Sequence, residues 1–236
     1  MSPNSIPLHE SFNAKVDVIG IEREPVIVLD NFLAEAERLV EHAAAHRGSF
    51  LQDTDFYPGI RMPCPKEYVY SVHGHLKRLL SEVFQLPESG VHGQSSYSIV
   101  TVRPEDLTDK QRIPHYEIPN RQSLAMIHFL CPSTFGGTSF YRHVATGYES
   151  IDERCVEEYS NILSGQIERT GPPEAAYING DTKQFQRIAT YGAEFNRALI
   201  FRGSSLQSDD IPPEYERDPD PRTGRLSITS FFKTGM

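Results

Sequence analysis

A succession of short strand-like runs fills the second half of the sequence, and it limits the folds open to this chain more than any other feature. From Ser95 onward, apolar and polar residues alternate with a period of two within each run, and turn residues separate the runs. The runs cover residues 96–104, 123–132, 138–143, 196–203 and 225–233. Such alternation between turns is typical of a barrel or sandwich, because successive side chains of a strand point to opposite faces. We therefore expect a mainly β protein.

Two helices are expected before these strands. A β-branched run at 26–29 meets Asp30 and Asn31, which are candidate N-caps for a helix from about residue 33 to residue 46. A second helix is expected at roughly 66–84. The pattern predicts an α+β chain in which helices flank the strands.

Chain length and composition favour one folded unit. With 236 residues, 38% of them hydrophobic and spread along the whole chain, the protein can bury a sizeable core, and we predict a single domain over residues 1–236. Residues 148–190 interrupt the strands with a polar stretch, in which a helix is expected around 156–163. We interpret this stretch as an insertion.

The charge of the chain limits the partners that it can bind. Lys and Arg number 23 against 32 Asp and Glu, a net charge of -9, which repels phosphate backbones and anionic lipid surfaces. We expect no nucleic acid and no membrane as partners, and the sequence makes no prediction of the oligomeric state. The amino terminus carries no signal-peptide pattern, so a cytoplasmic location is expected. Cys64, Cys131 and Cys155 form no CxxC pair and are expected to be reduced.

The segment IPHYE, at residues 113–117, is the strongest chemical motif. Pro114 favours extended backbone beside it, so His115 and Glu117 should project from the same face of a strand. An imidazole next to a carboxylate suits a divalent metal, and in non-haem iron enzymes a second histidine completes the set of three ligands. The alternative for such a pair is an exposed strand with one salt-bridging glutamate.

The loop that precedes the second helix contains a weaker motif. Residues 57–61 read YPGIR, within a stretch rich in Pro and Gly. We interpret it as an ordered structural loop. The alternative is that it lines a substrate entrance, where Arg61 would recognise an anion.

The order of motifs after Pro114 resembles that of the prolyl-hydroxylase-type iron(II)/2-oxoglutarate oxygenases, and more closely that of a related bacterial family of uncharacterised function. The likeness runs from about Glu24 to the carboxy terminus, and VIVLDNFL at 26–33 is similar to the family's opening strand and helix. The resemblance implies a double-stranded β-helix (jelly roll) with N-terminal helices packed on one sheet. It also implies iron(II) and 2-oxoglutarate as cofactors.

In this resemblance, the proximal metal motif falls on His115 and Glu117, with glutamate in place of the usual aspartate. The arginine that binds the distal carboxylate of 2-oxoglutarate falls on Arg225, with Ser227 two residues on along the same strand face. A guanidinium offers a planar fork of donors that matches a carboxylate. Tyr97 is placed to offer its hydroxyl to the same ligand, and the alternative is that its ring is simply packed.

Two positions depart from the family pattern. The distal histidine is expected within residues 201–212, and Gln207 stands at its place, as a third protein ligand that water could also replace. Its amide oxygen is a weaker donor to iron(II) than an imidazole, so metal affinity should fall. Phe129 stands where many relatives have a tyrosine that reaches 2-oxoglutarate.

Other histidines are not expected to replace the missing ligand. The family register turns Ala125 and Ile127 inward together with residue 129, so His128 should point away from the pocket. His143 is expected to have a surface or hydrogen-bonding role, with metal ligation as the alternative.

Three hypotheses follow from these residues. The first is an iron(II)/2-oxoglutarate-dependent oxygenase-like enzyme that oxidises a small molecule, amino acid or peptide, with His115, Glu117 and Gln207 at the metal and Arg225 at the co-substrate. The second is a catalytically silent jelly roll whose pocket binds a carboxylate ligand or a protein partner without redox chemistry. The third is a cupin-like sandwich that holds another metal.

Overall fold

The computed structural model of the chain describes residues 5–52, 56–86 and 91–234. Its helices are α1 (Glu37–Ala45), α2 (Lys66–Phe84) and α3 (Val156–Thr170). Short 3₁₀ helices lie in the connections: η1 (Arg47–Ser49), η2 (Pro104–Asp106), η3 (Asp109–Arg112) and η4 (Ser133–Phe135). Its strands are β1 (Asn13–Ile19), β2 (Glu24–Asp30), β3 (Leu51–Gln52), β4 (Gly59–Pro63), β5 (Val91–Val100), β6 (Leu124–Phe129), β7 (Gly137–His143), β8 (Phe185–Gly192), β9 (Ala198–Arg202), β10 (Gln207–Asp210) and β11 (Leu226–Thr234).

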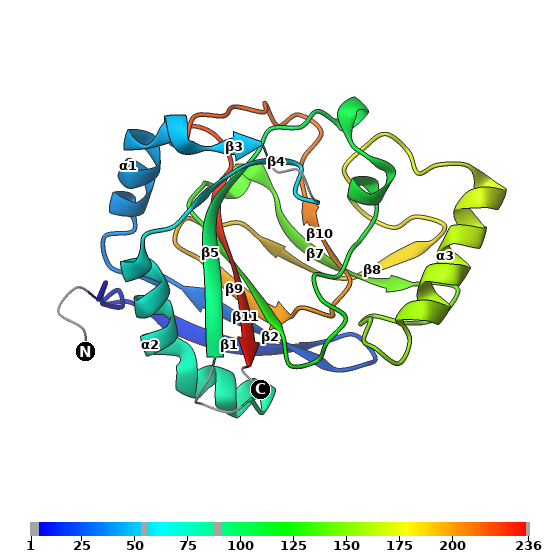
Figure 1. Cartoon of the computed structure of the whole chain (residues 1–236), viewed down its shortest axis with the longest axis horizontal. Coiled ribbons are helices and arrows are strands. Elements are labelled where there is room, and N and C mark those ends of the chain that lie inside the picture. The colour runs from blue at the N-terminus through cyan, green and yellow to red at the C-terminus, as the bar shows by residue number, and fades with distance from the viewer. Residues whose placement is uncertain (1–4, 53–55, 87–90, 235–236) are drawn as a thin grey trace.

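Two antiparallel sheets face each other (Figure 1). The large sheet has the strand order β1-β2-β9-β6-β11-β5-β4-β3, and the small sheet has the order β10-β7-β8. An isolated bridge between His115 and Gln207 adds one residue to the free edge of the small sheet beside β10. From β5 to β11 the chain passes repeatedly between the sheets, which is the path of a double-stranded β-helix. The predicted fold class, a mainly β jelly roll with flanking helices, is confirmed.

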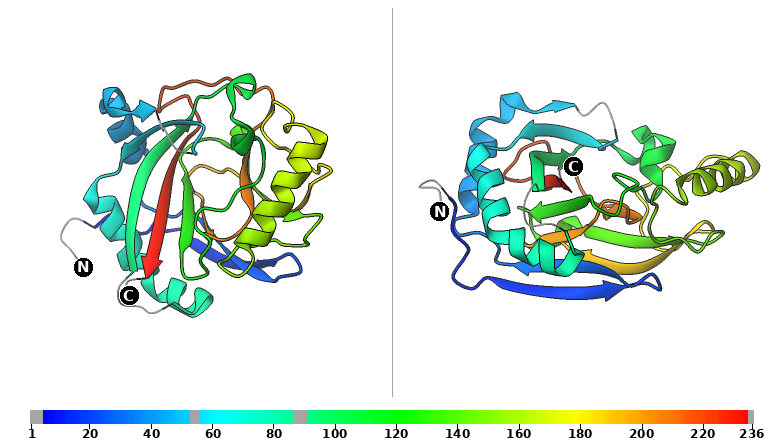
Figure 2. Two further views of the ribbon diagram at one scale, coloured as in Figure 1. Left: turned by 45° about the vertical axis from the view of Figure 1, so that its right-hand side comes forward. Right: turned by 60° about the horizontal axis from the view of Figure 1, so that its bottom comes forward.

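Helices α1 and α2 cover the outer face of the large sheet, and α3 lies at the opposite side of the molecule (Figure 2). The apolar side chains between these two helices and the sheet form the largest core cluster. This cluster includes Leu39, Ala43, Tyr68, Val72, Leu76, Leu80 and Phe84 from the helices and Ile27, Leu29, Tyr97, Ile99, Met126, Ile200 and Ile228 from the strands. Because alternate residues of each strand face this core, their neighbours face the space between the sheets.

The interior between the sheets has its own apolar core. This second cluster is built from Val26, Val28, Ala125, Ile127, Phe129, Phe140, Leu199 and Phe201. Ala125, Ile127 and Phe129 thus face inward, as the expected register has it. A strand whose two faces are both covered reads as a continuous apolar run, and β6 is buried over all six of its residues.

The predicted helix at 66–84 has the bounds of α2, whereas α1 begins four residues later than expected. Asn31 and Glu35 both adopt positive φ, 48° and 54°, and such left-handed residues cannot continue a right-handed helix. The helix therefore starts after Ala36, whose side chain makes no capping bond. The N-cap positions proposed at Asp30 and Asn31 were wrong.

Some elements were not anticipated. The strands β1, β3 and β10 were not predicted, and β8 begins inside the polar stretch 148–190. The prediction of an irregular loop at residues 57–61 was wrong from Gly59 onward, because β4 begins there and pairs with β5. Conversely, the segment around His115 was predicted as a strand and contributes only the single bridge. The long exposed stretches of β1 and β8 weaken the apolar alternation by which a strand is recognised in a sequence.

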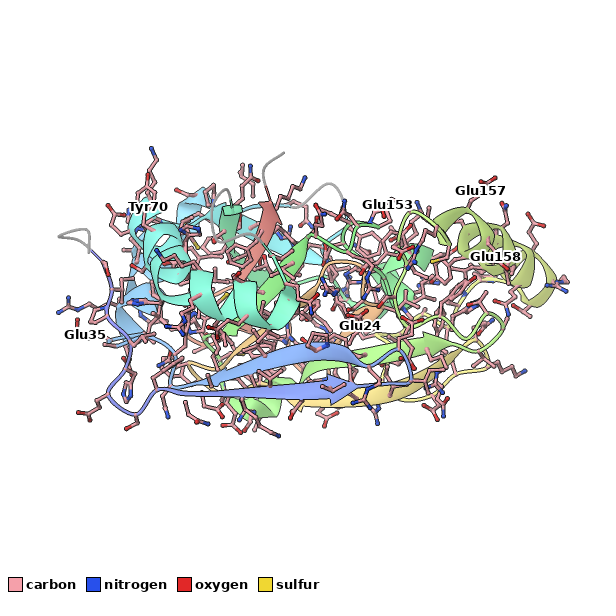
Figure 3. The ribbon with its side chains drawn as sticks, turned by 90° about the horizontal axis from the view of Figure 1, so that it is seen from below. Glu24, Glu35, Tyr70, Glu153, Glu157 and Glu158 are labelled. Atoms are coloured by element: carbon pink, nitrogen blue, oxygen red, sulfur yellow. The ribbon has the colours of Figure 1, made fainter. Side chains whose placement is uncertain are left out.

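Helix α3 extends to Thr170, beyond the expected end at residue 163. Glu153, Glu157 and Glu158 lie exposed around its start (Figure 3). Two of these carboxylates are in the first helical turn, where they complement the helix dipole.

The remaining expectations concern membranes and thiols. Among the described residues, no helix combines the length and the apolar character that crossing a membrane requires. Cys64, Cys131 and Cys155 are free.

Candidate functional site

A cavity of about 300 Å³ opens between the two sheets. Its walls come from the loop before β4, from β4 itself, from the segment 115–117 and from strands β6, β9, β10 and β11. A wider surface groove of about 510 Å³ shares Glu117 and Phe231 with the cavity and adjoins it. Volumes of this size fit small molecules.

His115, Glu117 and Gln207 converge on one side of this cavity. The Nε2 atom of His115 lies 3.3 Å from Oε1 of Glu117, and the amide nitrogen of Gln207 lies 2.8 Å from His115 Nε2 and 3.2 Å from Glu117 Oε1. Ligands at about 2.1 Å from a metal, in neighbouring positions of an octahedron, lie about 3 Å apart. The three side chains are therefore spaced as one face of an octahedral ligand set.

Backbone hydrogen bonds fix this arrangement. The amide of His115 donates to the carbonyl of Gln207 at 2.9 Å, and the amide of Gln207 donates to the carbonyl of His115 at 2.8 Å. The amide of Glu117 donates to the carbonyl of Gly203 at 2.8 Å. Residues far apart in the sequence are thus held side by side by the bridge at the edge of the small sheet.

The amide of Gln207 can serve either hydrogen bonding or metal binding. It is buried, and its nitrogen faces His115 and Glu117. A half-turn of the amide places its oxygen there instead, and the two orientations differ only in which atom faces the partners. Only the oxygen can ligate a metal. In the part of the chain that the structure describes, no group of three or more His, Cys, Asp or Glu residues could hold a metal, so any site here depends on this amide.

The electrostatics of the cavity keep Glu117 ionised. Burial alone would raise its pKa, but the hydrogen bond from His115 and the charges of His115 and Arg61 outweigh burial and hold the pKa below its usual value. The ring of Phe56 covers His115, with 4.5 Å between the ring centroids. A carboxylate that stays charged beside a shielded imidazole is suited to a divalent cation.

Arg225 lies at the deep end of the barrel and is already occupied. Its side chain is 1% exposed, its Nε donates to the carbonyl of Phe135 at 3.0 Å, and its Nη2 donates to the carbonyl of Gly137 at 2.8 Å. The same Nη2 forms an ion pair with Oδ1 of Asp209 at 3.0 Å. Burial alone would lower the pKa of Arg225, but the charge of Asp209 outweighs it and raises the pKa. The guanidinium of Arg225 is therefore already paired with a carboxylate of the protein.

Sequence reasoning overlooked Asp209, although a usable signal was present. This residue follows Gln207 by two positions on β10, so both side chains face the cavity, and both line it. The two-residue spacing from Gln207 would have sufficed to predict that the Asp209 carboxylate faces the cavity.

The two other residues expected at the co-substrate lie on opposite faces of the large sheet. Ser227 is buried and lines the cavity. Tyr97 lies opposite Ile228 in the register and stacks on His42, with 5.8 Å between the ring centroids, so its hydroxyl does not reach the cavity. The expectation that Tyr97 contacts a ligand there was wrong, and its alternative, a packed ring, describes what the structure has.

His128 and His143, the two histidines considered as replacement ligands, have hydrogen-bond partners elsewhere. His128 points to the helical side of the sheet, where it contacts Tyr68 and Asn196. His143 contacts Thr146 and Gln166 through its two ring nitrogens, at 2.9 Å and 2.7 Å. Both rings have hydrogen-bonding roles.

Residues 57–61, which include the start of β4, form a wall of the cavity. Tyr57 and Arg61 both line it, and the guanidinium carbon of Arg61 lies 4.3 Å from the centroid of the Tyr57 ring. Gly59 permits this arrangement, because a Cβ there would lie 1.9 Å from the carbonyl oxygen of Ile99 on the neighbouring strand. The segment therefore lines the cavity, and recognition of an anion by Arg61 stays a prediction.

Comparison with known proteins gives a family and a fold. Residues 10–232 match the family described as "Family of unknown function (DUF6445)". No curated protein matches the sequence.

Several solved structures share the fold at low sequence identity. The non-heme alpha ketoglutarate dependent carbocyclase SnoK from nogalamycin biosynthesis is 10% identical, with a TM-score of 0.52 over 89% of this chain and 80% of that chain. The non-heme alpha ketoglutarate dependent epimerase SnoN is 10% identical, with a TM-score of 0.49 over 90% of this chain and 79% of that chain. HygX from Streptomyces hygroscopicus, with nickel, 2-oxoglutarate and hygromycin B bound, is 9% identical, with a TM-score of 0.43 over 89% of this chain and 83% of that chain. Similarity at this level of identity, carried by SnoK, supports the jelly-roll fold alone.

Proposed function

Starting from the fact that this chain belongs to the DUF6445 family of unknown function, we propose that it is an iron(II)-dependent oxygenase-like protein of the 2-oxoglutarate type. Its substrate would be a small molecule, an amino acid or a peptide. The observation that carries the proposal is the convergence of His115, Glu117 and Gln207 at the separations of a facial ligand set. Because the chain has a net charge of -9, we do not propose nucleic acids or anionic membranes as its partners.

The donor set fits iron(II). An imidazole nitrogen, a carboxylate and an amide oxygen are all ligands that this ion accepts, and they leave the opposite positions open. When bound, iron(II) supplies the redox chemistry that activates oxygen. Glu117 would contribute the negative charge that offsets the cation, and the ring of Phe56 packs against His115. The cavity orients the substrate next to these groups.

The expected anchor for 2-oxoglutarate does not fit as it stands. Arg225 is ion-paired with Asp209, and its Nε and Nη2 also donate to two carbonyl groups. A second carboxylate at this guanidinium would have to compete with Asp209 and would lie next to its negative charge. The structure therefore supports the proposed metal site better than the proposed 2-oxoglutarate site at Arg225.

The weaker support for a 2-oxoglutarate site leads to a second candidate function. A jelly roll that binds a carboxylate ligand without redox chemistry needs no strong iron site, and Gln207 is a weaker metal ligand than histidine. The neutralised Arg225 weighs against binding of 2-oxoglutarate and so against the first candidate, although it is an equally poor anchor for another carboxylate. The two candidates differ in whether iron(II) binds at His115.

Anaerobic titration of the full chain with iron(II) distinguishes them. Under the proposal, the wild-type protein binds iron(II), His115→Ala loses the binding, and Gln207→His increases the affinity at least tenfold because imidazole is the better donor. His46→Ala, which removes an exposed histidine far from the cavity, is the matched control and should bind as the wild type does. Absence of iron(II) binding in both the wild type and Gln207→His would refute the proposed function and leave the silent pocket.

A further inference from the structure

The surface groove of about 510 Å³ extends the cavity outward. It is lined by two residues of β5, two residues that precede β6 and two residues of β11, namely Gly93, Gln94, Glu117, Ile118, Phe231 and Lys233. Glu117 and Phe231 line both the groove and the cavity. A molecule that occupies the groove therefore lies against one of the three side chains proposed to hold the metal.

Strand β11 connects the two spaces. Alternate residues of a strand face the same side of a sheet, so Ser227, Thr229, Phe231 and Lys233 form one row on the inner face of β11. The first three residues of this row line the cavity, and the last two line the groove. The row runs beside β5 toward the end of the strand (Figure 1). One elongated ligand can thus extend from the cavity along β11 to Lys233.

Lys233 places a positive charge at the outer part of the groove. Its side chain is exposed, and among the described residues no carboxylate forms an ion pair with it. The charges that lower the pKa of Glu117 come from His115 and Arg61 and not from Lys233, which agrees with the absence of an ion pair between Lys233 and Glu117. An ammonium group on a flexible stem binds carboxylates and phosphates as a point charge. The charge of Lys233 is therefore available to an anionic group of a ligand.

Apolar side chains also line the groove. Ile118 and Phe231 are only partly buried, so the apolar part of a ligand would cover them further and gain from that burial. Because a strand rises about 3.4 Å per residue, Lys233 lies about 7 Å from Phe231 along β11. An anionic group bound at Lys233 is thus several bonds away from the part of the ligand that lies against Glu117.

We propose that this groove binds the substrate, and that the substrate is an elongated small molecule with an apolar middle part and an anionic group that Lys233 binds. The proposal deepens the proposed function, because it names the substrate class of the same site. It rests on that function for the chemistry at the end of the molecule that enters the cavity. Binding in the groove itself requires no metal.

Calorimetric titration of the metal-free full chain with octanoate, and separately with octyl phosphate, tests the groove. Butyrate and octan-1-ol are the comparison ligands. We expect the wild type to bind at least one of the two long anions more tightly than butyrate, which is too short to cover the apolar side chains, and more tightly than octan-1-ol, which has no charge. The tighter of the two long anions identifies the anionic group.

Two substitutions separate the contribution of the charge from that of the apolar contact. Lys233→Gln should weaken binding of the long anion about fivefold and leave binding of octan-1-ol unchanged, since only the anion interacts with the ammonium group. Ile118→Ala should weaken binding of the anion and of octan-1-ol by the same factor, because both lose the same apolar contact. Lys233→Arg keeps the positive charge and should keep the affinity.

Two controls accompany these variants. Lys183→Gln removes the same charge from an exposed lysine outside the groove and the cavity, and it should bind as the wild type does. Thermal unfolding verifies that each variant is folded, and Lys233 is exposed near the end of its strand, where a substitution disturbs little packing.

Equal affinity of the wild type and Lys233→Gln for the long anion would overturn the proposal, as would the failure of both long anions to bind the wild type. These outcomes are separate from those of the iron(II) titration, because this titration contains no metal. A chain that binds iron(II) through His115, but whose affinity for anions is independent of Lys233, would retain the proposed function and lose only this substrate class.

Discussion

The ion pair between Asp209 and Arg225 allows the most direct test of how this barrel differs from a co-substrate-binding one. Its guanidinium is 1% exposed and its carboxylate 19% exposed. Removing one partner of a fully buried pair costs about 3–5 kcal/mol. Asp209→Asn keeps an acceptor, and Arg225 keeps its bonds to Phe135 and Gly137. We therefore expect a smaller loss of about 2 kcal/mol.

For a chain of this size, about 2 kcal/mol corresponds to a melting temperature lowered by about 4–8 °C. Asp209→Asn also leaves the charge of Arg225 unbalanced, so this arginine can attract anions. We expect 2-oxoglutarate to raise the melting temperature of the variant by more than that of the wild type.

Differential scanning calorimetry with and without 2-oxoglutarate measures both effects. Glu41→Gln is the matched control, because it removes a carboxylate from an exposed ion pair with Arg222 and should change stability by less than about 1 kcal/mol. Equal melting temperatures for Asp209→Asn and the wild type, with equal shifts on adding 2-oxoglutarate, would show that Asp209 does not neutralise Arg225.

Two further predictions concern the scaffold. Burial lowers the pKa of His128 to about 4, although its hydrogen bond to Asn196 acts in the opposite direction. The unfolded chain therefore binds more protons than the folded chain between pH 6.5 and 4, and the free energy of unfolding should fall by about 3 kcal/mol as the pH drops through this window. Urea unfolding should show this loss in the wild type, and an equal loss in His128→Gln would contradict the assignment. Gly59→Ala should displace β4 from β5, because the new Cβ would lie 1.9 Å from the carbonyl oxygen of Ile99. The expected result in urea unfolding is a loss of about 2 kcal/mol or more, whereas normal stability would argue against so close an approach.

The sequence by itself determined the elements that depend on local patterns. Period-two alternation located β5, β6, β7, β9 and β11, and helical periodicity located α2 with its bounds. The resemblance also predicted that His115, Glu117 and Gln207 converge, and the structure places their polar atoms within 3.3 Å of one another, while their role as metal ligands stays a prediction. These predictions succeeded because each rests on the spacing of residues in one segment, or on a resemblance that covers the whole chain.

Tertiary structure alone decided which groups face the cavity and which are already paired. Tyr97 and Ser227 lie on neighbouring strands, and only the register, in which Tyr97 is opposite Ile228, puts the tyrosine against the helices. A shift by one residue would have exchanged the two faces. Likewise, the sequence offers Arg225 as a free anchor, and only the tertiary contact between β10 and the residue that precedes β11 gives it Asp209 as a partner. Charge pairing and burial arise from contacts between segments distant in the chain, which no local pattern of residues encodes.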